Sequence, residues 1–161
     1  MARPSVERLK ELFVYDPSAG KIWWKVSGKG RSTHKPAGGL DGGAIRVTVE
    51  GKRYPVHRIV WAMTYGSWPP DDMMIDHIDG NVTNNWAGNL RLATNQENQR
   101  NTLAKNYYKC RQTGKWRVSL MIGGKSVCFG RYAFEELAVS VAKEVREKHF
   151  GEFATKGVRH R

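Results

Sequence analysis

The stretch of sequence that decides the fold is IDHIDGN at residues 75–81, NNWAGNLR at residues 84–91 and NQEN at residues 95–98. Short apolar runs before and after the central polar segment predict two strands, and the polar segment itself predicts a loop. The residues from Thr94 onward predict a helix. We therefore expect a strand, a loop, a strand and a helix within residues 73–103.

This unit carries side chains that suit phosphodiester hydrolysis. The reaction needs a base that takes a proton from water and positive charge that stabilises the phosphorus and the leaving oxygen. His77 offers an imidazole, which can act as a base near neutral pH. Asp76 and Asn98 offer hard oxygen ligands, which suit magnesium or manganese better than zinc. Adjacent strand residues point to opposite faces, so the chain must bend after His77, and the Asp79-Gly80 turn provides that bend.

The ordered motifs resemble the HNH nucleases, specifically the phage and intron-encoded homing endonucleases in which asparagine replaces the last histidine. The segments VHRIVW, WPPD and YDPSAGKIWWK are similar to these proteins too, so the resemblance covers most of residues 8–103. It implies a ββα-metal fold around one Mg²⁺ or Mn²⁺ ion and no zinc. It also implies that Asp76 and Asn98 bind the metal, that His77 is the general base, and that Asn89 braces the loop carrying the base.

Two further residues of this region are possible auxiliary residues, His57 and Arg91. His57 resembles a residue that the family keeps, but on a helix with an apolar face it could equally be a structural histidine. A lone Asp-His pair is more often a turn with a solvated histidine, and asparagines are common in loops and caps. The nuclease interpretation therefore depends on the whole ordered set and its flanking motifs.

Charge and cysteine content restrict the partners and the compartment. Lys and Arg number 27 against 15 Asp and Glu, which favours a polyanion, with nucleic acid before an anionic membrane surface. No apolar run reaches membrane-spanning length and the start lacks a signal peptide, so we expect a cytoplasmic protein, in the host cytoplasm if a phage encodes it. Cys110 and Cys128 form no CxxC pair, which excludes a cysteine-built zinc site; we expect free thiols, with a disulfide as the alternative.

The chain is expected to form an α+β protein with two domains, residues 1–104 and 105–161. In the first, helices are predicted over residues 5–14 and 56–66, and strands over residues 21–25 and 44–50. The second contains 13 basic and 5 acidic residues, against 14 and 10 in the first, so the smaller domain carries most of the net charge. The polar stretch of residues 99–106 separates the two.

The second domain is predicted as a three-stranded antiparallel sheet packed on one helix, over about residues 134–149. Residues 114–154 resemble the APETALA-type, or ethylene-response-factor, DNA-binding domain, which lays its sheet in the major groove. Alternation along the strands predicts an outward, DNA-binding face. Its members are Lys109, Arg111, Arg117, Ser119, Met121, Ser126 and Cys128. A basic sheet that holds phosphates without distinguishing bases is the alternative.

The sequence thus predicts a metal-dependent HNH endonuclease of double-stranded DNA, guided to its site by a second domain, as in a phage homing enzyme. The single copy of the motif set predicts a monomer that nicks one strand. One alternative is a non-catalytic DNA-binding regulator on an inactive nuclease scaffold. Another is a structure-specific or RNA-directed nuclease.

Overall fold

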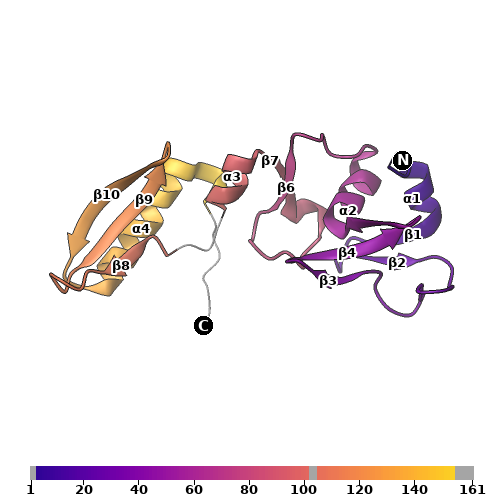
Figure 1. Cartoon of the computed structure of the whole chain (residues 1–161), viewed down its shortest axis with the longest axis horizontal. Helices are drawn as coiled ribbons and strands as arrows, with labels where there is room; N and C mark the ends of the chain where they lie inside the picture. Colours follow the sequence, from indigo (N-terminus) through magenta and orange to yellow (C-terminus); the bar gives the residue numbers. More distant parts are fainter. Residues whose placement is uncertain (1–2, 102–104, 155–161) are drawn as a thin grey trace. The chain divides into compact units, whose positions relative to one another are not determined.

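The computed structural model describes residues 3–101 and 105–154 of the 161-residue chain, and it mixes helices and strands as expected (Figure 1). The chain divides into two compact units, Met1–Asn98 and Gln99–Arg161. The boundary expected after residue 104 adjoins residues 102–104, which lie outside the described residues. Each unit has its own apolar core, so each is described by itself.

The first unit begins with helix α1 (Val6–Leu12), which Ser5 caps by accepting a hydrogen bond from the Arg8 amide at 3.1 Å. The helix ends earlier than the sequence predicted, because Phe13 starts strand β1 (Phe13–Asp16). This strand pairs antiparallel with β2 (Lys21–Trp24), which places the Phe13 ring 4.3 Å from the Trp24 ring. Both rings are buried, and that burial explains why the strand replaces the last helical turn.

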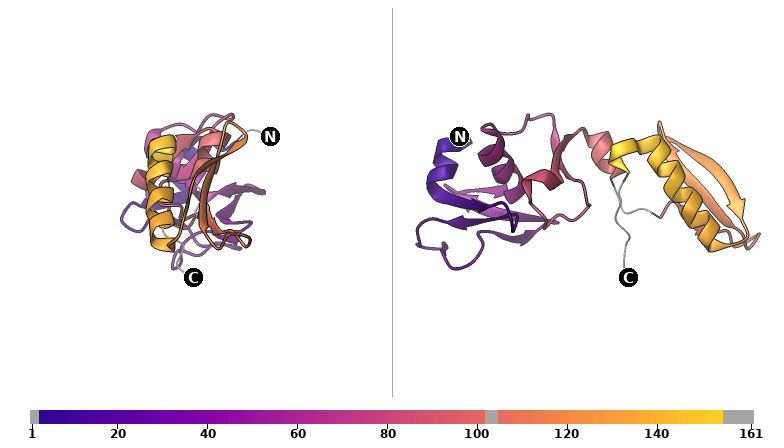
Figure 2. Two further views of the ribbon diagram at one scale, coloured as in Figure 1. Left: turned by 90° about the vertical axis from the view of Figure 1, so that its left-hand side faces the viewer. Right: turned by 180° about the vertical axis from the view of Figure 1, so that it is seen from behind.

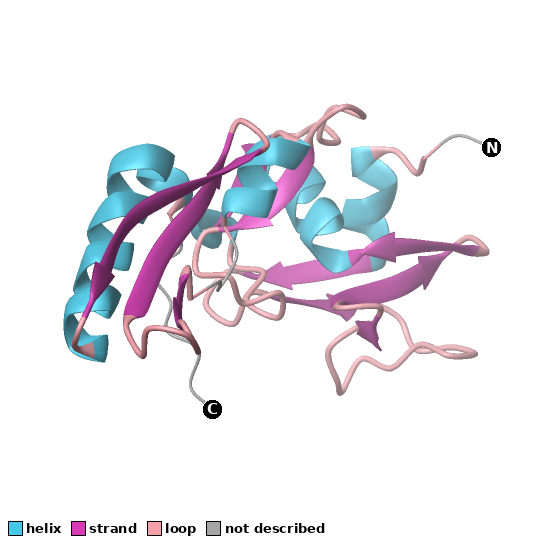
Figure 3. Cartoon of the chain, turned by 60° about the vertical axis from the view of Figure 1, so that its left-hand side comes forward, coloured by secondary structure: helices cyan, strands magenta, loops and turns pink. Residues whose placement is uncertain are grey.

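A second sheet and a second helix complete the core of this unit. Strands β3 (Gly39–Asp41), β4 (Ala44–Val49) and β5 (Lys52–Pro55) are antiparallel, with β4 in the middle. Helix α2 (Val56–Tyr65) follows directly and ends at Gly66, whose φ of 75° suits glycine. Figure 3 shows α1 and α2 on the same side of this sheet. The most deeply buried side chains of the core include Leu9, Phe13, Ile22, Val49, Ile59 and Val60.

The predicted strand, loop, strand and helix are present next along the chain. Strand β6 (Met74–His77) pairs antiparallel with β7 (Leu90–Ala93), and a short 3₁₀ turn, η1 (Ala87–Asn89), precedes β7. Helix α3 (Asn95–Arg100) follows β7 and crosses the division between the two units. Ile75 and Leu90 join the apolar core, which ties the hairpin to α2.

In the second unit, strands β8 (Tyr107–Lys109), β9 (Trp116–Ile122) and β10 (Lys125–Tyr132) form an antiparallel sheet with β9 in the middle. Helix α4 (Glu135–Phe150) lies along one face of that sheet, and the short η2 (Gly151–Phe153) follows (Figure 2). Val118 and Leu120 of β9 pack against Ala138 and Ala142 of α4, and all four are buried. Alternation along β9 predicted this helix-facing side.

One buried arginine ties the start of this unit to α4. Arg146 is 8% exposed, and its guanidinium donates to the Asn106 side-chain oxygen and to the Arg100 carbonyl at 2.9 Å. Burial lowers the pKa of Arg146, but an arginine remains charged at neutral pH. The bond to Arg100 helps to explain why residues after Asn98 belong to the second unit.

Across the part of the chain that the structure describes, no helix is both long enough and apolar enough to span a membrane.

Candidate active site

The β6–β7 hairpin holds the central pair of residues, Asp76 and His77, at the end of β6. Asp76 stands opposite Arg91 and His77 stands opposite Leu90. Both side chains are buried, at 4% and 6% exposure, which is unusual for polar groups and requires that each has partners. Because they are neighbours on a strand, they serve two different faces of the hairpin.

Asp76 forms a shielded ion pair with the residue across the hairpin. Its Oδ2 lies 2.9 Å from Nε and 2.7 Å from Nη2 of Arg91. The two side chains are only 5% and 13% exposed. A buried carboxylate needs such a partner, because burying it alone would be far more costly. Arg91, predicted as an auxiliary residue, thus holds Asp76 in place.

His77 is held by a residue to which the sequence analysis gave no role. Its Nε2 lies 2.9 Å from Oδ1 of Asn85, which is 1% exposed. A carbonyl oxygen only accepts hydrogen bonds, so this pairing puts the proton of a neutral ring on Nε2 and the lone pair on Nδ1. Asn85 therefore selects the tautomer of His77. The NN pair of the motif was the only signal in the sequence that could have indicated this role.

His57 contacts His77 from helix α2, with the two ring centroids 5.2 Å apart and the rings at right angles. Burial, followed by the charges of His77, Arg58 and Arg46, lowers the pKa of His57 from 6.5 to about 3. His57 is therefore neutral at neutral pH. Within the described residues its buried Nδ1 has no hydrogen-bond partner. The structure thus places His57 against His77, where a structural and an auxiliary role are both compatible with its position.

Asn89 braces the loop between β6 and β7. Its side-chain oxygen accepts from the Asp79 amide at 3.1 Å, and its Nδ2 donates to Asp79 Oδ1 and to the Asn84 carbonyl, both at 2.9 Å. Asn84 also donates to Asp79 Oδ2 at 2.8 Å. Burial raises the pKa of Asp79, but hydrogen bonds from Asn84, the Asn81 amide and Asn89 outweigh it and hold that pKa below its ordinary value. The loop after His77 is thus fixed around one carboxylate.

Asn98 is positioned by a capping box at the start of α3. The Glu97 carboxylate accepts from the amide and the hydroxyl of Thr94, both at 2.8 Å, and the Glu97 amide donates back to the Thr94 hydroxyl at 3.2 Å. One residue later, Asn98 Nδ2 lies 3.8 Å from the sulfur of Met74. Met74 and Asp76 are two apart on β6 and share a face, so Asn98 approaches the face that bears Asp76.

The donor chemistry of Asp76 and Asn98 fits a hard divalent cation. A carboxylate and an amide oxygen are ligands typical of Mg²⁺ and Mn²⁺. Among the described residues, there is no group of three His, Cys, Asp or Glu side chains that could hold a metal ion. A cation at Asp76 and Asn98 would therefore take its remaining ligands from water or substrate, as magnesium commonly does.

The outward face of the second unit differs from the predicted one at β8. The register pairs Tyr108 with Arg117 and Lys109 with Trp116, so Lys109 lies on the helix side of the sheet. Strand β8 ends at Lys109, which leaves Arg111 in a turn. The placement of Lys109 on the outward face was wrong, because the register places it opposite Trp116 rather than Arg117. The placement of Arg111 on a strand was wrong because β8 ends before it.

On β10 the pairing adds a residue that the sequence analysis missed. Ser126 stands opposite Met121 and Cys128 opposite Ser119, in agreement with the predicted alternation. A bulge between Cys128 and Gly130 then shifts the register, so that Arg131 stands opposite Arg117. The outward face consists of Tyr108, Arg117, Ser119, Met121, Ser126, Cys128 and Arg131.

Comparison with protein families gives the class to which this site belongs. Residues 54–100, which begin within β5 and end with α3, match the family model described as HNH endonuclease. This segment is therefore similar to the HNH endonucleases, and it includes Asp76, His77, Asn89 and Asn98.

A viral protein provides the second match. A protein of Acanthamoeba polyphaga mimivirus, described as an uncharacterized HNH endonuclease, is 32% identical to this chain over 102 residues. The aligned part is 62% of this chain and 54% of the relative, so the chain spans about half the length of the curated relative it matches. No solved structure matches this chain. The two matches together support a nuclease.

Proposed function

We propose that the protein is a metal-dependent endonuclease that hydrolyses phosphodiester bonds in double-stranded DNA. The observation that carries this proposal is the end of β6, where a partnered carboxylate, Asp76, adjoins an oriented imidazole, His77. Both lie in the segment that matches the HNH endonucleases. The net charge of +12 suits a polyanionic substrate.

In this proposal, His77 takes a proton from the attacking water through Nδ1 while Asn85 holds Nε2. The new bond forms between the water oxygen and phosphorus, and the bond from phosphorus to the leaving oxygen breaks. Asn89 keeps the loop after His77 fixed. Asp76 and Asn98 would hold one Mg²⁺ or Mn²⁺ ion, whose positive charge would stabilise the phosphate and the leaving oxygen.

We further propose that the second unit places the enzyme on its DNA. The outward face of β8–β10 presents two arginines, Arg117 and Arg131, beside the exposed side chains of Tyr108 and Met121. Arginine side chains can pair with guanine edges in the major groove and with phosphates. This face suits an APETALA-type arrangement, with α4 packed on the other side of the sheet.

One motif set for each chain supports a monomer that nicks a single strand in the manner of a phage-encoded homing enzyme. The two dissimilar units in series suit an extended, asymmetric DNA site better than a two-fold symmetric one.

The proposal is tested by incubating a supercoiled plasmid with the full-length protein in Mg²⁺, in Mn²⁺ and in chelator. We expect open circles to accumulate before linear DNA in either metal, and no cutting in chelator. Asp76→Ala should abolish the metal-dependent cutting. Intact plasmid under all conditions, with DNA still bound, would instead favour a non-catalytic DNA-binding regulator.

A further inference from the structure

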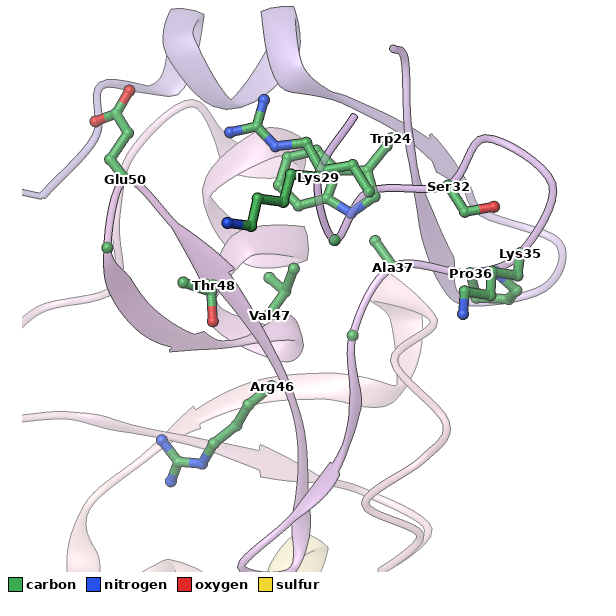
Figure 4. A pocket seen from close by; sticks show the side chains of 14 residues that line it. Trp24, Lys29, Ser32, Lys35, Pro36, Ala37, Arg46, Val47, Thr48 and Glu50 are labelled. Carbon is green, nitrogen blue, oxygen red and sulfur yellow. The ribbon is translucent and has the colours of Figure 1, made fainter. Parts of the chain in front are cut away.

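A cleft of about 490 Å³ lies in the first unit, between the 29–38 loop and strand β4 (Figure 4). Lys29 and Trp24 lie on one side of this opening, and Val47 and Thr48 of β4 lie on the other. The proposed catalytic residues do not line it. The cleft therefore requires its own explanation.

The loop that forms the cleft is tied to the rest of the unit at both ends. Gly28 and Arg31 exchange backbone hydrogen bonds of 3.1 and 2.9 Å, and the Ala37 amide donates to the Ile22 carbonyl at 2.7 Å. Gly38 has a φ of 98°, and a Cβ there would lie 2.8 Å from the Arg46 carbonyl oxygen. The loop thus meets β4 closely at Gly38, where only glycine fits.

Basic residues predominate in the lining of the cleft, which has Lys29, Arg31, Lys35 and Arg46 against one carboxylate, Glu50, and in the chain segment that forms it. Eight basic and two acidic residues lie between Lys21 and Arg53, so this segment alone has a net charge of +6. Residues 1–104 as a whole have 14 basic and 10 acidic residues, a net charge of +4. The remainder of residues 1–104 is therefore net acidic, so the net positive charge of this region resides in the segment that includes the cleft lining.

Three of the four cations that line the cleft are not neutralised by carboxylates; the fourth, Arg46, lies 3.8 Å from Asp41. Within the described residues, no carboxylate pairs with Lys29, Arg31 or Lys35. Glu50, the acidic residue of the lining, is bound to Arg8 at 2.9 Å. Three positive charges therefore face a solvent-filled cleft with nothing to balance them, as a phosphate-binding surface requires.

The cleft suits the binding of phosphates better than the stacking of bases. Its aromatic residue, Trp24, is 6% exposed, and the Arg31 guanidinium lies 4.7 Å from the centre of its ring. The arginine occupies the position that a stacked base would need. That stacking also restrains Arg31, so less side-chain freedom is lost when it contacts an anion.

Arg46 connects the cleft to the candidate active site. It lines the cleft, and on the β4–β5 hairpin it stands opposite Pro55, two residues before His57, which contacts His77. Arg46 thus lies between the cleft lining and the histidine pair, where a bound DNA strand would contact it. We propose that this cleft binds the sugar–phosphate backbone of the DNA flanking the cleavage site, through Lys29, Arg31 and Lys35. This inference rests on DNA being the substrate, as proposed above.

The experiment measures the affinity of the full-length protein for a labelled random-sequence DNA duplex, in chelator, over a range of salt concentrations. The test variant is Lys29→Gln/Lys35→Gln. The control is Lys10→Gln/Lys143→Gln, which removes the same charge at exposed lysines of α1 and α4, outside the cleft lining and outside the segment that forms the cleft. Lys29→Arg/Lys35→Arg keeps the charge, and thermal unfolding of each variant shows whether it folds.

Without the two lysine–phosphate interactions, the plot of log affinity against log salt should flatten by about 1.8, and binding should weaken roughly ten-fold or more at moderate salt. The control should keep the wild-type slope, and the arginine variant should restore it. An unchanged slope in the test variant, or an equal change in the control, would overturn the inference. Binding in chelator does not depend on hydrolysis, so failure here leaves the plasmid test of the nuclease unaffected.

Discussion

At the scale of single residues, the burial of His57 makes the stability of the first unit depend on pH. Burial keeps His57 neutral, with its pKa lowered to about 3. In the unfolded chain the same histidine titrates near 6.5. The unfolded state therefore takes up the proton first as the solution is acidified.

We expect full stability above pH 6.5 and a progressive loss as the pH falls from there toward about 3. The His57 contribution should amount to roughly 2–4 kcal/mol at the acid end. In His57→Gln this contribution disappears, so the variant should lose less stability on acidification than the wild type. Urea unfolding at a series of pH values measures the difference. Parallel pH profiles for the two proteins would show that His57 is not buried in its neutral form.

The residues with reactive or metal-binding side chains could be identified from the sequence, but the residues that position them by hydrogen bonds or ion pairs could not. Asp76, His77 and Asn98 were selected because their chemical types recur at a definite spacing in HNH nucleases. Asn85 was not assigned, because its contact with His77 depends on how the loop before η1 folds back. The Asp76–Arg91 pair likewise depends on the register of β6 and β7, which arises only when the hairpin folds.

At the scale of elements, long periodic segments were predictable, whereas some of the short strands were not. Helices α2 and α4 and strand β9 have enough residues for their apolar period to be clear. Strands β1, β3 and β5 were missed. Strand β1 begins inside the helix predicted over residues 5–14, and β3 and β5 are edge strands whose three or four residues show no clear alternation. The outward face of the second sheet needed the pairing of β8 and the bulge in β10, which are tertiary features.

The corrected face gives a matched pair of variants. Arg131 shares a face with Arg117, whereas Lys109 stands opposite Trp116 on the helix side. We expect Arg131→Gln to weaken DNA binding and to reduce the salt slope by about 0.9, the value for one phosphate, or to relax base preference if it contacts a base. Lys109→Gln should change the DNA affinity and the salt slope less than Arg131→Gln does. Titration of both variants against the same duplex measures the difference. A larger loss of affinity in Lys109→Gln would mean that DNA binds another side of the sheet.

Helix α4 lacks a side-chain cap at its first turn. Its N-cap is Phe134, which is 70% exposed and makes no capping hydrogen bond. Phe134→Ser should supply an acceptor for the first backbone amides and stabilise the second unit by about 1 kcal/mol. Chemical denaturation provides the measurement, with Val139→Ser, an exposed position inside the helix, as the control that should not stabilise. No gain at Phe134 would show that the aromatic side chain contributes more than its exposure indicates.

At the scale of the whole molecule, the two units have separate cores and different net charges, which suggests different roles. Each has a separate apolar core, and the proposed catalytic residues lie in the first. Residues 105–161 have 13 basic and 5 acidic residues, a net charge of +8. Most of the long-range attraction to DNA is therefore expected from the second unit, and the chemistry from the first.

Removal of residues 105–161 should leave a weaker and less selective nuclease. The shortened protein binds fewer phosphates, so its affinity should fall and its salt slope should flatten by about 0.9 for each phosphate that it no longer binds. Selectivity is measured as the rate of cutting at one site relative to the rate of cutting in competitor DNA, for the full-length and the shortened protein. The circular dichroism spectrum shows whether the shortened chain folds. Equal binding and equal selectivity would mean that the second unit does not guide the enzyme.

The most direct test of the account is the cleavage rate of His77→Ala, measured together with its affinity for the same DNA. His149→Ala, which removes an exposed histidine of α4, outside the surfaces proposed to bind DNA, is the control. We predict that His77→Ala lowers the rate by more than ~100-fold, because water loses its general base. Affinity should stay within a few-fold of wild type, because phosphate contacts dominate it. Near-normal cleavage by His77→Ala would contradict the assignment of the active site to the end of β6.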